Sequence, residues 1–153
     1  MIGFLTGKII SSKPTQILLD VNGVGYTVNI SINTFEKISE KKTVSLFIHT
    51  SVKEDSITLF GFFTQSEKEM FELLISISGI GPKLGLSILS GIVVDDLKFA
   101  ISNGNVSRLI AIPGIGRKTA ERVVLELRNK VDAIKAEGSI KEISAKDEAI
   151  SAL

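Results

Sequence analysis

The sequence predicts an α+β protein in two parts, a small β-barrel followed by an all-α region. Three observations support this prediction. Residues 1–62 contain short apolar or β-branched runs separated by turn-forming residues, which is typical of strands. Near Thr64 the spacing of the apolar residues changes from two to about 3.6 residues, which indicates helices. A glycine-containing segment also occurs twice within the second part.

Strands in the first part are expected at Ile2–Ile10, Gln16–Val21, Tyr26–Ser31, Thr43–Val52 and Ile57–Phe62. Turn-forming residues separate several of these runs, namely Lys13-Pro14, Asn22-Gly23 and Glu54-Asp55-Ser56. We expect a short helix or a loop at Ile32–Lys41, between the third and fourth strands. Short strands without a long helical pattern favour a Greek-key barrel of the OB-fold type over residues 1–63.

The all-α region is expected to extend over residues 64–131. Its first helix should begin near Thr64, where either Thr64 with Glu67 or Ser66 with Glu69 offers a capping box. The apolar face of that helix would contain Met70, Phe71, Leu74, Ile75 and Ile77. Shorter helices are expected at Lys83–Leu89, Asp95–Ser102, Val106–Ala111 and Arg117–Lys130, with Asp95 and Asn105 as N-caps.

Beyond the helices the composition changes again. Residues 132–146 are rich in Lys, Glu, Ala and Ser, which predicts a flexible linker. Residues 147–153 (DEAISAL) are expected to be the start of a truncated C-terminal helical domain.

The composition limits the chemistry and the location of the protein. The 153 residues contain no cysteine, which excludes disulfides and thiolate metal sites and fits the reducing cytoplasm. The N-terminus lacks the features of a signal peptide, and no run reaches the roughly 18 apolar residues that a membrane span needs. We therefore expect a cytoplasmic protein without a membrane segment, a metal site or a cofactor.

The repeat is the most informative feature of the sequence. Residues 74–89 (LISISGIGPKLGLSIL) and 109–124 (LIAIPGIGRKTAERVV) share the pattern Gly-Ile-Gly-x-Lys, and the first glycines, Gly79 and Gly114, are 35 residues apart. Glycine permits a tight turn between two helices and a close approach of a ligand to the backbone. Ile80 and Ile115 are expected to fill the gap between the paired helices, and Pro82 suits the first helical position.

Each second helix would direct unpaired N–H groups and the positive end of its dipole at a phosphate. The net charge of the chain is only +1, but the stretch 102–130 contains six basic and two acidic residues. One Gly-x-Gly turn is more typical of an ordinary helical hairpin, whereas two matched copies with basic residues indicate binding to a DNA backbone. The candidate DNA-binding residues are Gly79, Gly81, Lys83, Gly114, Gly116, Arg117, Lys118 and Arg122.

The repeated segment resembles the helix-hairpin-helix family, in which paired motifs grip the two strands of a duplex. The whole chain resembles the RuvA family, through MIGFLTGKI at the start, NGVGY at 22–26, KED at 53–55, LFGF at 59–62 and PGIGRKTAERVVLEL at 113–127. This resemblance implies a non-catalytic subunit that recognises Holliday junctions in recombination and repair. It implies a homotetramer, one or two of which hold a four-way DNA junction open for the partner ATPase RuvB.

The resemblance also gives roles to two further segments. Glu54 and Asp55 would form an acidic pin at the junction centre, although from the residues alone this pair is ordinary turn chemistry. In the family a C-terminal domain contacts RuvB, and only Asp147–Leu153 would remain of it here. We therefore expect this chain to bind junctions and to couple poorly to the ATPase.

Other functions receive less support from the sequence. In a helix-hairpin-helix DNA glycosylase, Lys118 would be the nucleophile and an aspartate would follow roughly 18–20 residues later, but that stretch holds Ala136–Gly138. A nucleotide-binding P-loop is excluded because Arg117 separates Gly116 from Lys118. His49 lies in an apolar strand and is expected to be packed rather than catalytic. A protein-interaction module remains a third possibility, which salt-dependent DNA binding would distinguish.

Overall fold

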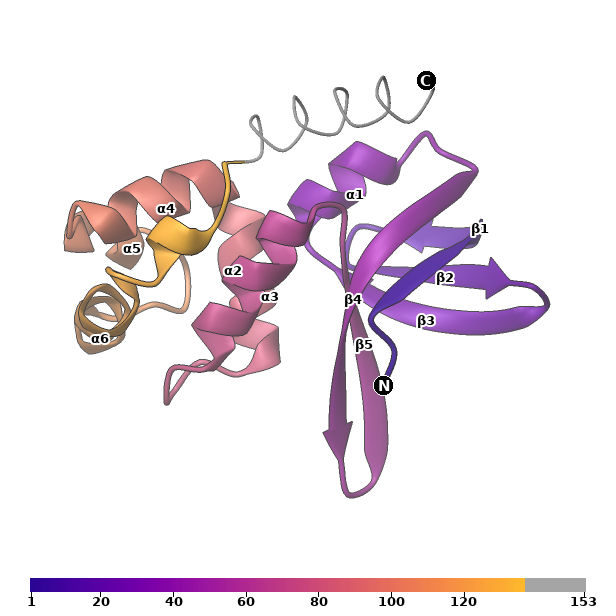
Figure 1. Cartoon of the computed structure of the whole chain (residues 1–153), viewed down its shortest axis with the longest axis horizontal. Coiled ribbons are helices and arrows are strands. Elements are labelled where there is room, and N and C mark those ends of the chain that lie inside the picture. Colours follow the sequence, from indigo (N-terminus) through magenta and orange to yellow (C-terminus); the bar gives the residue numbers. More distant parts are fainter. Residues whose placement is uncertain (137–153) are drawn as a thin grey trace.

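The computed structural model describes residues 1–136, in which a β-barrel is followed by a group of short helices (Figure 1). The strands are β1 (Phe4–Lys13), β2 (Gln16–Val21), β3 (Val24–Ile30), β4 (Thr43–Lys53) and β5 (Ser56–Phe62). They form a closed barrel in the order β1-β2-β3-β5-β4, in which β3 and β5 are parallel and the other neighbours are antiparallel. The predicted OB-fold type of barrel is confirmed.

The first strand begins at Phe4 instead of Ile2 and ends at Lys13 instead of Ile10, and it pairs with both neighbouring strands. Its first half pairs with β4 and its second half with β2, and the pairing register shifts between Ile9 and Ser11. Such a bulge bends a strand, so β1 can continue to Lys13 instead of ending at Ile10. The Asn22-Gly23 turn is confirmed, with φ values of 53° and 90° that suit a tight hairpin.

Alternate residues of the strands fill the barrel, among them Ile17, Leu19, Val28, Leu46 and Ile48. The segment between β3 and β4 contains helix α1 (Ile32–Ile38), whose N-cap is Ser31. The Ser31 hydroxyl accepts a hydrogen bond from the Thr34 N–H at 3.0 Å. The expected short helix at this place is therefore present.

The remaining helices are α2 (Gln65–Ile75), α3 (Pro82–Gly91), α4 (Val94–Ser102), α5 (Val106–Ile110), α6 (Arg117–Leu127) and the 3-10 turn η1 (Val131–Ala133). The predicted N-caps Thr64 and Asn105 are confirmed, because each side chain accepts from a first-turn N–H. The prediction for Asp95 was wrong. Helix α4 begins one residue earlier with Val93 as its N-cap, and Asp95 lies in the first turn, where a carboxylate favours the helix dipole.

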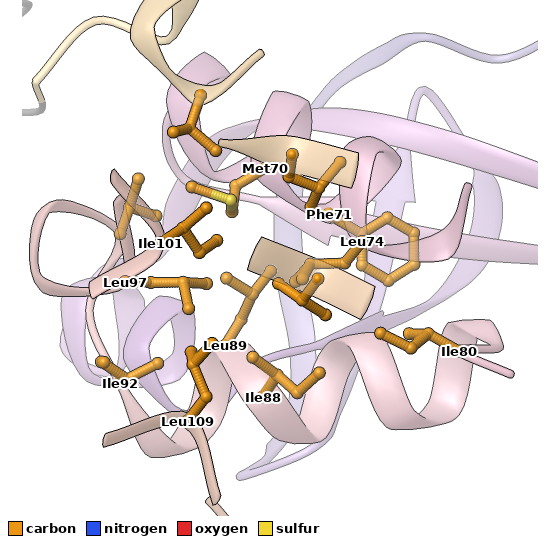
Figure 2. Packing of buried hydrophobic residues seen from close by; sticks show 14 of the residues in the cluster. Met70, Phe71, Leu74, Ile80, Ile88, Leu89, Ile92, Leu97, Ile101 and Leu109 are labelled. Carbon is orange, nitrogen blue, oxygen red and sulfur yellow. The ribbon is translucent and has the colours of Figure 1, made fainter. Parts of the chain in front are cut away.

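The helices share one apolar core, in which Met70 and Leu74 of α2 meet Ile88 of α3 and Leu97 of α4 (Figure 2). Gly85 allows α3 to lie close to α2, since a Cβ there would be 3.1 Å from Ile75 and 3.2 Å from Phe71. Two barrel residues, Phe60 and Phe62 of β5, belong to the same core. The ring centroids of Phe62 and Phe71 are 4.9 Å apart, so the barrel and the helices are joined by apolar packing.

Polar contacts also connect the two parts. Glu67 of α2 is buried, and its carboxylate accepts hydrogen bonds from the hydroxyls of Ser31 and Thr34. Nearby, the Nδ1 atom of His49 lies 2.8 Å from a carboxylate oxygen of Glu72. The His49 ring packs edge-on against Phe71, which agrees with the expected packing role. These contacts fix the orientation of α2 on the barrel.

The packed helical region extends further along the chain than the sequence predicted, although its last helix is shorter. Helix α6 ends at Leu127 instead of Lys130, but the chain after it stays packed, because Val131 and Ile134 are buried in the helical core. The backbone carbonyl of Ile134 accepts from the Lys98 ammonium at 2.5 Å, and the carbonyl of residue 135 accepts from the Ser66 hydroxyl at 2.7 Å. The prediction that a flexible linker starts at residue 132 was therefore wrong, because Val131 and Ile134 anchor the η1 turn in the helical core. Residues 137–146 of that linker and the predicted helix start at 147–153 lie outside the described residues.

Candidate nucleic-acid interface

The repeat folds into two helical hairpins with the same local geometry. The first joins α2 to α3 and the second joins α5 to α6. Gly79 and Gly114 have φ values of 98° and 93°, a left-handed conformation that disfavours residues with a Cβ. The turns are closed alike, by the Ile80 N–H to the Ile77 carbonyl at 3.0 Å and the Ile115 N–H to the Ile112 carbonyl at 3.2 Å.

The two central isoleucines anchor these turns. Ile80 and Ile115 are only 3% and 5% exposed, and both belong to the helical core. Figure 2 shows Ile80 at one edge of that core. The prediction that these side chains fill the gap between the paired helices is confirmed, and the flanking glycines are held at the surface as a result.

The second glycine of each motif has a different role. Gly81 and Gly116 are the N-caps of α3 and α6, with φ values of −87° and −89° that any residue can adopt. A Cβ at either position would meet no protein atom within 4 Å. Neither the backbone conformation nor internal packing therefore requires glycine at these two places. What glycine provides there is an open approach to the backbone from outside.

The helix N-termini at these glycines are open to an external acceptor. Helices α1, α2 and α5 are capped by the side chains of Ser31, Thr64 and Asn105, whereas α3, α4 and α6 have no side-chain cap. The first N–H groups of a helix have no intrahelical partner. Pro82 removes one such donor from α3, so α6 presents one more N–H than α3 does.

Basic side chains surround both N-termini. Lys83, Arg117, Lys118 and Arg122 are all exposed. Arg117 pairs with Glu121 at 3.6 Å and Arg122 with Glu126 at 3.4 Å, but such exposed pairs contribute little stability. Within residues 1–136, neither lysine has an ion-pair partner.

A hollow of about 230 Å³ lies between the two hairpins, lined by Ser78, Lys118, Thr119 and Arg122. Arg122 of the second hairpin donates to the Ser78 carbonyl of the first hairpin at 3.3 Å. A larger hollow of about 610 Å³ lies between α3, the second hairpin and the barrel, and its lining includes Lys83, Ser87 and Pro113. The smaller hollow has two basic and two hydroxyl side chains and no carboxylate, so it suits an anionic ligand, whereas the lining of the larger hollow is mostly apolar.

The candidate pin residues lie apart from the hairpins, at the tip of the β4–β5 ribbon. Lys53 and Ser56 form its last cross-strand pair, so Glu54 and Asp55 are the whole turn, and both are exposed. The neighbouring pair of Val52 and Ile57 is 61% and 70% exposed. Figure 1 shows this ribbon extending from the barrel toward the same side as the turn between α2 and α3.

The sequence did not point to Ser78 or Thr119 as lining residues, nor to the exposed pair of Val52 and Ile57. Ser78 and Thr119 come together only through contact between the hairpins, which a linear pattern does not reveal. Within residues 1–136, no three His, Asp or Glu side chains gather in a way that could hold a metal ion. In the same residues, every helix is too short or too polar to cross a membrane.

The chain is similar to two protein families and to several curated relatives. Residues 1–61 match the family described as RuvA N terminal domain, and residues 71–129 match the SAM-like helix-hairpin-helix tandem family. The Holliday junction branch migration complex subunit RuvA of Geobacter sulfurreducens is 59% identical over 132 residues, which are 86% of this chain and 66% of that protein. The protein of the same name from Geobacter metallireducens is 55% identical over 143 residues, 93% of this chain and 72% of that protein. The chain thus spans about two thirds of the length of these curated relatives.

Proposed function

The chain belongs to the RuvA family, and from this premise we propose that it binds four-way DNA junctions as the DNA-recognising subunit of a branch-migration complex. The observation that carries this proposal is the matched pair of open hairpins. Gly81 and Gly116 leave the N-termini of α3 and α6 accessible, and Lys83 and Lys118 stand beside them without ion-pair partners in residues 1–136. Two such sites on one rigid unit suit the two strands of a duplex.

The proposed contacts are to the phosphate backbone. Backbone N–H groups, lysines and arginines bind phosphate oxygens whatever the base sequence, so they position a protein on DNA without selecting a sequence. Junction specificity must then come from geometry, through the arrangement of several copies of this unit. We propose a homotetramer, with one or two tetramers holding the four arms of the junction.

The exposed carboxylates of Glu54 and Asp55 have a place in this arrangement. If the ribbon tips of four copies converge near the symmetry axis, their carboxylates lie close to the phosphates at the crossover. Like charges repel most strongly at distances below the screening length, which is about 8–10 Å at ordinary salt concentrations. The pins would therefore keep the crossover open while the hairpins hold the arms.

In this proposal the chain performs no catalysis itself, and the ATPase RuvB supplies the motor, acting with it in the cytoplasm. The glycosylase alternative is not favoured. A Schiff-base lysine needs a lowered pKa and a carboxylate partner, but the hollow around Lys118 is lined by Ser78, Thr119 and Arg122. The family membership also points to junction binding rather than base excision.

A competition gel shift tests the proposal. The protein is bound to a labelled four-way junction, and unlabelled linear duplex with the same arm sequences is added as competitor. We expect the junction complex to survive an excess of duplex and to dissociate as salt increases. Equal competition by junction and duplex would reduce the function to general DNA binding, and binding to neither would exclude a DNA-binding role.

A further inference from the structure

The two hairpins touch each other at a point that the repeat does not explain. The Cδ1 atom of Leu84, in the first turn of α3, lies 2.7 Å from the position that a Cβ would occupy on Gly114. A Leu84 methyl group thus packs against the turn glycine of the second hairpin on the side where its Cβ would lie. At Gly79, the equivalent glycine of the first hairpin, a Cβ would meet no atom within 4 Å.

A second contact runs in the opposite direction. Arg122, in α6 of the second hairpin, donates a hydrogen bond of 3.3 Å to the Ser78 carbonyl in the turn of the first hairpin. Each contact therefore joins the turn of one hairpin to the second helix of the other. Leu84 also corresponds in the repeat to Thr119, which lines the hollow beside Ser78.

We propose that Leu84 is a positioning residue, which together with Arg122 sets the spacing between the two phosphate-binding turns. Leu84 is apolar and half-buried, so this role needs no contact between its side chain and DNA. The inference rests on the proposed function, since spacing matters only if both turns bind one duplex.

The spacing affects affinity because the two turns act as linked binding sites. When their separation is fixed at the value that a duplex requires, the second contact forms at a high effective concentration once the first has formed. When the separation varies, the protein binds mostly through one turn at a time. The number of phosphates engaged then falls, although every basic side chain is still present.

Leu84→Ala should therefore weaken the salt dependence of DNA binding, although the change removes no charge. The slope of log affinity against log salt, which counts the phosphates engaged, should fall to about half of the wild-type slope. If Leu84 contributed only packing, Leu84→Ala would lower the free energy of unfolding, but the folded variant would keep the wild-type slope of log affinity against log salt. Leu84→Met, which keeps the volume of the side chain, should restore the wild-type slope.

Leu86→Ala is the matched control. Leu86 lies on the same helix and is also half-buried, but it lines the hollow that faces the barrel. The variant should keep the wild-type slope. A slope that falls equally in Leu84→Ala and Leu86→Ala would contradict the specific role of Leu84, since it would then report a general effect of weakened α3 packing.

The spacing can also be measured without DNA. Because the chain has no cysteine, Ser76→Cys with Ala111→Cys introduces one pair of spin labels per chain, at equivalent exposed positions just before the two turns. Mixing the labelled chain with an excess of unlabelled protein restricts the measured distance to the pair within one chain. Double electron–electron resonance should give a narrow distance distribution in this background and a broader one when Leu84→Ala is added. An unchanged distribution in a variant that still unfolds cooperatively would overturn the inference, even if the wild type binds junctions. Broadening in a protein that binds no DNA would instead refute the proposed function and leave the positioning contact in place.

Discussion

Lys53 and Ser56 face each other as the last paired residues of the β4–β5 ribbon, and this pairing leaves Glu54 and Asp55 alone at its tip. The exposed Val52–Ile57 pair next to them shows that the ribbon continues past the barrel core. The two carboxylates are therefore held away from the protein and free to meet a ligand.

Removing the two negative charges at the ribbon tip distinguishes a pin that repels phosphates from a turn that only stabilises the fold. Glu54→Gln with Asp55→Asn should change the free energy of unfolding by no more than about 0.5 kcal/mol, because exposed turn substitutions seldom cost more. Junction affinity should stay the same or increase, since the lost carboxylates no longer oppose phosphates. Gel shift and denaturant unfolding measure the two quantities. A natively folded double variant that no longer binds junctions would contradict the repulsive role.

The two glycines of the second hairpin should respond differently to a methyl group. Gly116→Ala should leave the free energy of unfolding within about 0.5–1 kcal/mol of wild type, because its φ is −89° and the space around it is open. It should nevertheless weaken DNA binding, since the new Cβ lies where a phosphate would approach. Gly81→Ala is expected to behave in the same way in the first hairpin.

Gly114→Ala should instead destabilise the fold by about 1–3 kcal/mol, because its φ is 93° and Leu84 occupies the space of a Cβ. Thermal and denaturant unfolding of the two variants provide the comparison. If Gly116→Ala were the more destabilising change, the assignment of Gly116 to ligand approach would be wrong.

Removing one of the proposed phosphate-binding cations should lower both the affinity for DNA and the salt dependence of that affinity. Lys118→Ala should reduce the steepness of the log affinity against log salt plot by about one, with little dependence on the DNA sequence. Lys130→Ala is a control in the same basic stretch, because Lys130 is exposed but follows the end of α6. Equal slopes for Lys118→Ala and wild type would place Lys118 outside the DNA contact.

The buried carboxylate of Glu67 connects the barrel to the helical region. Glu67→Ala would leave the hydroxyls of Ser31 and Thr34 without their shared acceptor, which costs about 1–3 kcal/mol of unfolding free energy per buried unsatisfied group. Glu67→Gln retains an acceptor oxygen and should be milder. Denaturant unfolding checks the order of the two variants, and a Glu67→Ala protein as stable as wild type would contradict the structural role.

Much of the fold could be predicted because the local signals agree with the tertiary structure. Strand alternation, the Asn22-Gly23 turn and the caps at Thr64 and Asn105 depend on residues close in sequence. The error at Asp95 arose because a good capping residue also suits the first turn, and the helix began one residue earlier.

Contacts between distant segments could not be predicted in this way. Ile134 is buried in the helical core and its carbonyl accepts from Lys98, which is 36 residues away, and the linker composition concealed these contacts. The contacts of Leu84 with Gly114 and of Arg122 with Ser78 likewise exist only after the two hairpins have packed together. The repeat predicted the two binding turns, but the contacts that set their spacing required the structure.

Native mass spectrometry of the DNA complexes tests the central claim most directly. The protein is mixed in parallel with a four-way junction and with a linear duplex of the same arm sequences, and the masses of the complexes are recorded. We expect one junction bound by four or eight chains, and no stable complex of this stoichiometry on the linear duplex. Complexes of one or two chains that form equally on both DNAs would contradict it.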